Sequence, residues 1–312
     1  MKSRIFLLLG ICCFALVACE GGDGKDVEKP GNGNNGENDT PQQETLLTWT
    51  KRASCPIMSV NERISLNRVI YMASTAGDFV SYDPTKDTWN TLTRISGHLF
   101  AWQENLYRQV DSDIYIYRSD TDTWEEATNL PKLTPMPSLS PSIIGLVYSI
   151  GGRLFQLYGS SNYYNARIYQ SNTHKWEDTE INRDGIPLGV YLKYFVPNTH
   201  YCEVKNCLYL YYEGVILQFN PMNCIFTTKI SLDHTPSYIV KYDENNILYY
   251  SPDKKGYHYR YGFYSITKNE YSTYDMTSAP ESPAPKGPIT NINNRLFFGP
   301  DNAAFYLSLI HI

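Results

Sequence analysis

The residue types best suited to ligand chemistry lie in irregular polar segments of the second half of the chain. Tyrosine rings stack on the C–H faces of sugars, and Asn, Asp and Arg side chains hydrogen-bond hydroxyl groups or pair with a carboxylate. The sequence therefore predicts a ligand site made by Tyr163, Tyr164, Asn165, Arg183, Asp184, His234, Lys254, Tyr257, His258 and Tyr259. The alternative is that these segments are solvated loops without a ligand.

Motifs of familiar catalytic centres are missing from the sequence. The six histidines have no HExxH or other paired spacing, and no GxSxG, P-loop or GxGxxG occurs in the right context. The acidic run at 120–123 does not have the spacing of a calcium-binding EF-hand loop. We therefore expect no metal and no cofactor. The turn aspartates Asp83, Asp87, Asp120 and Asp122 are expected to cap turns.

Charge and composition narrow the class of protein further. The 312 residues carry a formal net charge of -5, which argues against non-specific nucleic-acid binding, because such binding needs a basic surface. Tyrosine is unusually frequent, with 27 copies, and aromatic residues favour strands. The composition therefore favours a β-rich protein with aromatic contact surfaces.

A repeated pair of aromatic residues, separated by six positions, predicts the elements that hold these segments in place. The pairs are Tyr82/Trp89, Tyr117/Trp124, Tyr169/Trp176, Phe219/Phe226 and Tyr264/Tyr271. Each pair encloses a polar turn after a short apolar segment, which is typical of a β-hairpin. A second hairpin with an Asn or Gly turn precedes each pair, so each repeat is predicted to have four strands. We expect the paired aromatics to pack between neighbouring repeats.

The two ends of the repeat region complement each other. The segment around Trp49 resembles a last strand without its hairpin, and the C-terminal segment lacks a last strand. Pairing the N-terminal strand with the last repeat would close a ring and remove two exposed sheet edges. Outer-strand aromatics would then lie at Trp49, Trp89, Trp124, Trp176, Phe226 and Tyr271, which predicts six units.

In these features the chain resembles the Kelch type of β-propeller, in which a Tyr and a Trp about six residues apart lie on the two outer strands of every blade. The resemblance covers residues 45–312 and implies an all-β, six-bladed propeller with four-stranded antiparallel blades. One departure is that the only double glycine, Gly151-Gly152, fits a turn better than the end of a Kelch second strand. In such a ring the ligand segments named above are expected on one face, around the central channel.

The N-terminus is expected to be a targeting signal that is removed from the mature protein. Residues 1–18 have a basic start and a short apolar run, as in a secretory signal peptide. The ending LVAC resembles a bacterial lipobox, which implies cleavage before Cys19 and lipid attachment to it. Residues 19–44 are rich in Gly, Asn and acidic residues and predict a disordered tether. The resemblance implies a lipid-anchored protein of the outer membrane, facing either the cell surface or the periplasm.

Four cysteines remain beyond the lipobox: Cys55, Cys202, Cys207 and Cys224. The export route permits disulfides. We nevertheless expect mostly free, packed thiols, because an intervening strand should separate Cys207 from Cys224. A Cys202–Cys207 bridge is the alternative.

These observations favour a non-catalytic, membrane-anchored lipoprotein whose propeller binds a carbohydrate or a protein on one face. The alternative is a sugar-active enzyme, by a distant resemblance to the N-acetylneuraminate epimerase/mutarotase propellers. In that reading Arg183 would hold a carboxylate, and His234 or His258 would shuttle protons. A third hypothesis is a scaffold protein of a larger outer-membrane assembly.

Overall fold

The computed structural model describes residues 47–57, 60–94, 96–135, 144–160, 163–185, 201–212, 214–232, 238–252, 259–275, 289–292, 295–301 and 304–310. All of these belong to one compact unit, Glu44–Ile312. Throughout these ranges the regular secondary structure consists of strands, which form six sheets that we number sheet 1 to sheet 6 along the chain.

Sheets 1 to 3 are four-stranded and antiparallel. Sheet 1 contains β2 (Val60–Leu66), β3 (Val69–Ser74), β4 (Phe79–Asp83) and β5 (Thr88–Leu92). Sheet 2 contains β6 (His98–Trp102), β7 (Asn105–Val110), β8 (Asp113–Arg118) and β9 (Thr123–Glu126). Sheet 3 contains β10 (Leu146–Ile150), β11 (Arg153–Ser160), β12 (Tyr163–Gln170) and β13 (Lys175–Glu180).

Sheets 4 to 6 complete the arrangement. Sheet 4 contains β14 (Asn182–Gly185), β15 (Tyr201–Val204), β16 (Cys207–Tyr212), β17 (Val215–Asn220) and β18 (Ile225–Ser231). Sheet 5 contains β19 (Tyr238–Lys241), β20 (Asn246–Pro252), β21 (Tyr259–Ser265) and β22 (Glu270–Asp275). Sheet 6 contains β23 (Ile289–Ile292), β24 (Arg295–Asp301), β25 (Ala304–Ile310) and β1 (Leu47–Lys51).

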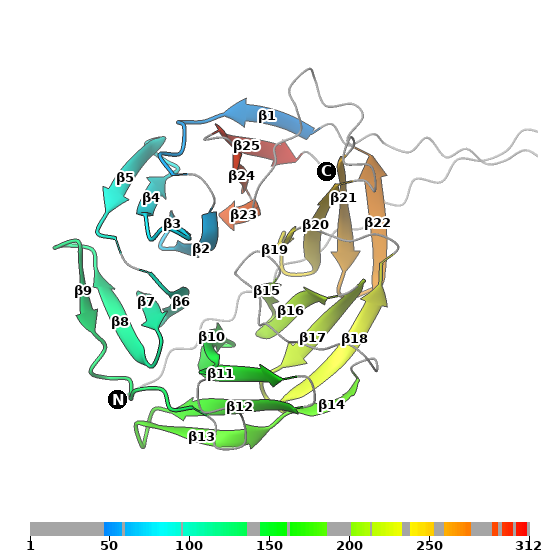
Figure 1. Cartoon of the computed structure of the whole chain (residues 1–312). Coiled ribbons are helices and arrows are strands. Elements are labelled where there is room, and N and C mark those ends of the chain that lie inside the picture. Colours follow the sequence, from blue (N-terminus) through cyan, green and yellow to red (C-terminus); the bar gives the residue numbers. More distant parts are fainter. Residues whose placement is uncertain are drawn as a thin grey trace, which may run out of the picture. The chain divides into compact units, whose positions relative to one another are not determined.

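The sheets are arranged as a β-propeller, with the inner strands β2, β6, β10, β15, β19 and β23 around the centre (Figure 1). The predicted all-β propeller of four-stranded antiparallel sheets is therefore confirmed. The number of four-stranded blades is corrected. The sequence predicts six of them, whereas five sheets have four strands and sheet 4 has five. In sheet 4 the segment before the blade pairs in parallel with the outer strand β18, with Asn182 opposite Ile225. This fifth strand, β14, satisfies backbone groups on an edge that would otherwise be open.

The ring closes as the sequence predicts. Strand β1 pairs antiparallel with β25, and Trp49 lies opposite Ser308 in this register. The first strand of the described chain thus becomes the outer strand of the last sheet (Figure 1). Both terminal strands lose a free edge by this pairing, which is the usual advantage of closing a propeller.

The inner hairpins of sheets 1, 3 and 4 have the two-residue Asn or Gly turns that the sequence predicts, whereas that of sheet 2 has Gln103–Glu104. In these four hairpins both turn residues have positive φ, the conformation that matches the twist of a two-residue hairpin. These turns are Asn67–Arg68 (51° and 66°), Gln103–Glu104 (46° and 60°), Gly151–Gly152 (60° and 74°) and Lys205–Asn206 (51° and 59°). The double glycine therefore lies in the turn after an inner strand.

The outer hairpins share a hydrogen bond that the aromatic pattern alone did not reveal. The first aromatic of the pair contacts the side chain five residues later, whose backbone has positive φ. The contacts are Tyr82 Oη to Asp87 Oδ1 (2.6 Å), Tyr117 Oη to Asp122 Oδ1 (2.9 Å), Tyr169 Oη to His174 Nδ1 (3.0 Å) and Tyr264 Oη to Asn269 Oδ1 (2.8 Å). These turn residues thus serve as partners of the tyrosines as well as turn formers.

The fifth outer hairpin changes both partners together. Phe219 has no hydroxyl, and the position five residues later is Cys224 instead of an oxygen or nitrogen acceptor. Both side chains are buried in the core of sheets 3 and 4. The paired change avoids a buried polar group without a partner, which would cost free energy.

The outer hairpins also hold the connections that arrive from the preceding sheets. Asp87 Oδ1 accepts from the Ala53 amide (3.0 Å), and Trp89 Nε1 donates to the Ala53 carbonyl (2.8 Å). In the next sheet the Asp122 carboxylate accepts from the Thr93 amide (3.0 Å). In sheet 3, Trp176 Nε1 donates to the carbonyl of Pro131 (3.1 Å). The repeat thereby fixes each blade to the chain segment that precedes it.

The first aromatic of each pair also packs against an aromatic ring of the preceding sheet. The ring pairs are Tyr82–Phe297 (5.8 Å between centroids), Tyr117–Phe79 (5.6 Å), Tyr169–Trp102 (5.7 Å), Phe219–Phe155 (5.5 Å) and Tyr264–Tyr209 (6.4 Å). Such tilted and edge-to-face contacts each contribute about 0.5–1.5 kcal/mol beyond the burial of apolar area. One residue type at one repeat position therefore joins the sheets around the ring.

A double-mutant cycle in sheet 4 tests the tyrosine–acceptor pair. Phe219→Tyr alone should lower the free energy of unfolding, because the new hydroxyl finds no oxygen acceptor. Combined with Cys224→Asp, it should regain stability, with a coupling free energy of about 1–2 kcal/mol. Urea denaturation of the four proteins measures this coupling. Tyr117→Phe is the reference and should cost about 2 kcal/mol. Strict additivity of the two sheet 4 changes would contradict the pairing.

Candidate functional site

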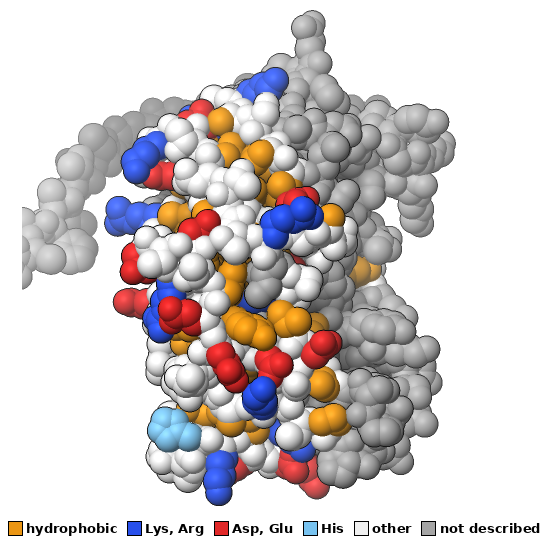
Figure 2. Space-filling view, turned by 60° about the vertical axis from the view of Figure 1, so that its left-hand side comes forward, with side chains coloured by type: hydrophobic (Ala, Val, Ile, Leu, Met, Phe, Trp, Pro, Cys, Tyr) orange, Lys and Arg blue, Asp and Glu red, His pale blue; other side chains and the backbone are white. Residues whose placement is uncertain are grey.

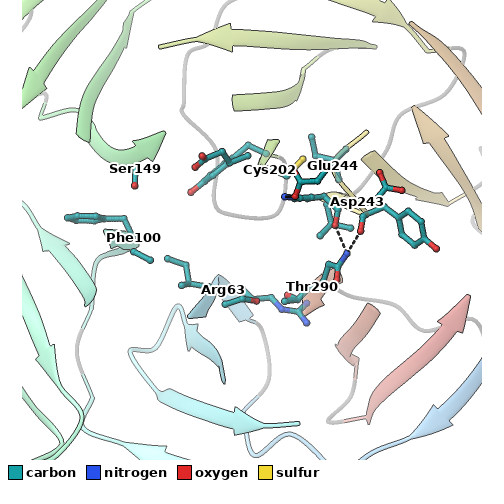
Figure 3. Close-up of a pocket in the computed structure, with 17 residues that line it drawn as sticks. Arg63, Phe100, Ser149, Cys202, Asp243, Glu244 and Thr290 are labelled. Carbon is teal, nitrogen blue, oxygen red and sulfur yellow. Dashed lines mark hydrogen bonds and ion pairs between the residues drawn. The ribbon is translucent and has the colours of Figure 1, made fainter. Parts of the chain in front are cut away.

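The inner strands enclose a cavity of about 760 Å³ at the centre of the propeller. All six contribute to its wall, and so does the turn after β19. The lining residues are Arg63, Ile64, Ser65, Phe100, Ala101, Ser149, Tyr201, Cys202, Glu203, Ile239, Val240, Lys241, Tyr242, Asp243, Glu244, Thr290 and Asn291. Seven of them are labelled around the open space in Figure 3. We call this cavity the channel pocket.

Arg63 on β2 is a structural cation of the pocket wall. Its side chain is buried and donates through Nη2 to the Phe297 carbonyl (3.2 Å) and through Nη1 to the Gly299 carbonyl (3.4 Å). Burial lowers the pKa of this guanidinium to about 9. Since both acceptors belong to sheet 6, Arg63 joins the first sheet of the ring to the last.

Glu203 on β15 is the carboxylate that faces the pocket with the least compensation. Its Oε1 accepts from the Gly151 amide (3.0 Å), which links sheets 3 and 4. Burial raises the pKa of this carboxyl, and the Gly151 hydrogen bond and the charge of Lys241 only partly oppose that effect. The Lys241 ammonium is itself paired with Glu244. Among the described residues no ion pair joins Glu203 to a cation.

Asn291 and its neighbours supply hydrogen-bonding groups without charge. The Asn291 Nδ2 group donates to the carbonyls of Lys241 (2.9 Å) and Tyr242, shown as dashed lines in Figure 3. These bonds join sheets 5 and 6 and turn the amide into a fixed part of the wall. The hydroxyls of Ser149 and Thr290 line the same pocket from β10 and β23.

Tyr201 and Cys202 are neutral parts of the wall. Burial raises the pKa of the Tyr201 hydroxyl well above its ordinary value, and burial likewise raises the pKa of the Cys202 thiol. The Tyr201 ring packs edge-on against Tyr148 of sheet 3, with centroids 5.2 Å apart. The thiol is therefore a packed, unreactive group, since nucleophilic cysteines need a lowered pKa. Cys55, Cys202, Cys207 and Cys224 are all free thiols, the state that the sequence favours.

A buried histidine, His98, connects three of the inner strands that form the pocket wall. His98 on β6 contacts Glu62 Oε1 of β2 through Nδ1 (3.3 Å) and the Val147 carbonyl of β10 through Nε2 (3.0 Å). Both side chains are almost fully buried. One imidazole thus connects three inner strands, which fixes the spacing of the wall residues that they present.

The predicted ligand residues that the structure describes are not among the residues that line the channel pocket. Tyr163, Tyr164 and Asn165 begin strand β12 instead of forming a loop, and Tyr259 begins β21. Arg183 and Asp184 lie in β14, on the outer edge of sheet 4. Of all these residues the structure describes the backbone but no side chain. His234, Lys254, Tyr257 and His258 lie outside the described residues.

The residues of the channel pocket escaped the sequence analysis for a physical reason. Inner strands have short, mostly apolar sequences, and their polar members, such as Glu203 in YCEV or Ser149 in LVYSI, look like ordinary alternation. Only the ring brings six such strands together. A usable signal was the polar residue at the same late position of several inner strands.

The outer side of the propeller looks different from the pocket. Figure 2 shows the side of sheets 1 and 2, where acidic and basic side chains lie among small groups of hydrophobic ones. Two of the ion pairs are Arg118–Glu125 (2.8 Å) and Lys132–Asp113 (2.9 Å). Over the part of the chain that the structure describes, the exposed large hydrophobic side chains are Met222 and Tyr271. No helix in that part is long and apolar enough to span a membrane.

Comparison with known proteins supports the fold and no more. No family model and no curated protein matches the chain. Among solved structures, 886 chains match it. One is the crystal structure of a protein of unknown function from Bacteroides thetaiotaomicron VPI-5482, with a TM-score of 0.57 and 11% identity over 86% of this chain and 77% of that one. The chain is thus a β-propeller with a polar pocket in its channel.

Glu203, which has no ion pair among the described residues, leads to a testable prediction about stability. Because the folded state raises the pKa of Glu203, the ionised form destabilises the fold, and this cost disappears as the pH falls below the unfolded pKa of about 4.3. Glu203→Gln should therefore have a higher Tm than the wild type at pH 7, and the difference should shrink towards pH 4. Thermal unfolding followed by circular dichroism measures it; a Tm difference independent of pH would contradict the assignment.

Proposed function

We propose that the protein is a membrane-anchored lipoprotein whose propeller binds a carbohydrate in the channel pocket without catalysing a reaction on it. The observation that carries the proposal is the pocket itself, to which all six sheets contribute side chains. Its volume of about 760 Å³ lies within the usual range for small-ligand sites, about 300–1,000 Å³. A concave site of this size suits a sugar better than the surface of a protein partner.

The chemistry of the wall also supports a hydroxyl-rich ligand. Ser149, Thr290 and Asn291 offer donors and acceptors from three different sheets. Phe100 and Tyr242 add aromatic surface to the same wall. Carbohydrates combine hydroxyl groups with apolar C–H faces, and mixed polar and aromatic walls can satisfy both.

The anchor belongs to the same proposal. The lipobox-like LVAC sequence ends at Cys19, and a polar, glycine-rich segment of the sequence separates it from the propeller. Lipid attached to Cys19 would hold the protein at the outer membrane. One acyl chain alone binds membranes weakly, so stable anchoring depends on more than one chain.

The anchor is tested by replacing its cysteine. Cys19→Ser should abolish incorporation of radiolabelled palmitate and should move the protein from the membrane fraction to the soluble fraction. Cys55→Ser is the matched control and should keep both the label and the membrane location, because Cys55 is buried in the propeller. Palmitate labelling that persists in Cys19→Ser would overturn the proposed attachment site.

Carbohydrate binding is tested on a glycan array, with hits measured by calorimetry. Ser149→Trp should abolish binding, because an indole on β10 would fill the pocket. Thr91→Trp is the control, since this exposed residue of β5 lies far from the pocket lining, and it should bind as the wild type does. Binding that survives Ser149→Trp would exclude the pocket, and an array without hits would contradict carbohydrate binding.

A second candidate function, a sugar-active enzyme, rests on Glu203. Mutarotation needs an acid and a base near an anomeric centre, and a carboxyl with a raised pKa is suited to that role. The same preparation should be assayed for mutarotation of the sugars that bind. A rate enhancement that disappears in Glu203→Gln would favour the enzyme over the binding protein.

A further inference from the structure

The charged side chains of the channel pocket are unevenly compensated. Two cations and three carboxylates line it: Arg63, Lys241, Glu203, Asp243 and Glu244. Lys241 is paired with Glu244, and the Arg63 guanidinium is directed at backbone carbonyls of sheet 6. Both cations of the pocket are therefore already occupied by protein groups, and a ligand would meet the remaining carboxylates.

The two remaining carboxylates differ in what they can offer. Asp243 is used within its own turn, because Oδ1 accepts from the amides of Asn245 (2.6 Å) and Asn246 (2.8 Å) and Oδ2 accepts from Asn246 Nδ2 (2.9 Å). Glu203 has one bond, from the Gly151 amide to Oε1. Among the described residues, no bond is formed to its Oε2, and the side chain is exposed to the pocket.

Glu203 is therefore an exposed carboxylate in a concave site, with one bond to the protein. A ligand that displaces water from this carboxylate must replace the lost hydration, and a cation does so through an ion pair. Glu203 belongs to sheet 4, and its side chain is bonded to the Gly151 amide of sheet 3. Its position is therefore fixed before any ligand binds. A carboxylate held in place is suited to bind a cation, because the ligand provides the opposite charge and little reorganisation is needed.

We propose that the channel pocket selects sugars that carry a primary ammonium group, with Glu203 as the counter-ion. The inference rests on the proposed function and adds the class of ligand. The ammonium group binds at Glu203 Oε2, and the sugar hydroxyls bind to neighbouring groups of the wall. One such group is Ser149, which lines the same pocket and lies two residues before Gly151, the residue whose amide bonds to Glu203. Asn291 presents its Oδ1 as an acceptor, since Nδ2 is engaged with the backbone.

Calorimetry on the full chain with three related sugars tests the selection. Glucosamine carries the ammonium group, glucose carries a hydroxyl in its place, and N-acetylglucosamine carries an uncharged amide. At pH 7 glucosamine should bind about tenfold more tightly than either of the others, because it alone forms an ion pair with Glu203. Equal affinities for glucosamine and glucose would overturn the inference and leave the proposed function standing.

Two substitutions, each of which removes one negative charge, test whether the preference for glucosamine depends on Glu203. Glu203→Gln keeps the oxygen that accepts from the Gly151 amide and should abolish the preference for glucosamine, while the affinity for glucose stays within about twofold. Glu125→Gln, on the outer strand β9, removes a surface carboxylate paired with Arg118 and should leave the preference intact. An equal loss in both variants would show a long-range charge effect and overturn the role of Glu203. Failure of all three sugars to bind would contradict both proposals for these monosaccharides.

Discussion

The contact between the first aromatic of each repeat and its surroundings holds the propeller together. At this position one side chain packs on a ring of the preceding sheet and, where it is a tyrosine, bonds to the turn of its own hairpin. The turn residue in its left-handed conformation and the second aromatic bind the incoming chain, as Asp87 and Trp89 do at Ala53. In sheet 4, Phe219 and Cys224 keep the packing and give up the hydrogen bond together. Packing is thus the constant requirement, and the hydrogen bond accompanies it wherever a hydroxyl is present.

The channel pocket is a consequence of that outer framework. Once the outer hairpins set the spacing between sheets, the inner strands are brought around a common centre, and contacts such as those of Arg63 and His98 hold them at fixed distances. Other polar groups of the wall, such as Asn291 and Asp243, are also bonded to protein groups. Glu203 uses only Oε1, for the bond from the Gly151 amide, and burial raises the pKa of its carboxyl. Groups with such shifted pKa values occur most often at catalytic and ligand-binding sites.

How much could be predicted follows from how local each signal is. The outer hairpins have their aromatics and turn residues within eight positions, directly after an apolar strand, so the sequence predicts them. From the two incomplete ends it also predicts the pairing of β1 with β25. The fifth strand of sheet 4 could not be predicted in the same way, because β14 pairs in parallel with a strand about 40 residues later. The expected ligand segment at Tyr163–Asn165 proved to be strand for a related reason, since its pairing with β11 is set by the sheet and not by its polar composition.

The sequence by itself determined the repeat, the all-β class and the closure of the ring, because a hairpin and its packing residues are encoded within each repeat. The tertiary structure alone decided which side chains share the channel pocket. Residues as far apart as Arg63, Glu203 and Asn291 meet there. Their proximity depends on the rotation from one sheet to the next, accumulated around the whole ring. No local sequence pattern specifies this accumulated rotation, so the residues of the pocket could be identified only from the closed propeller.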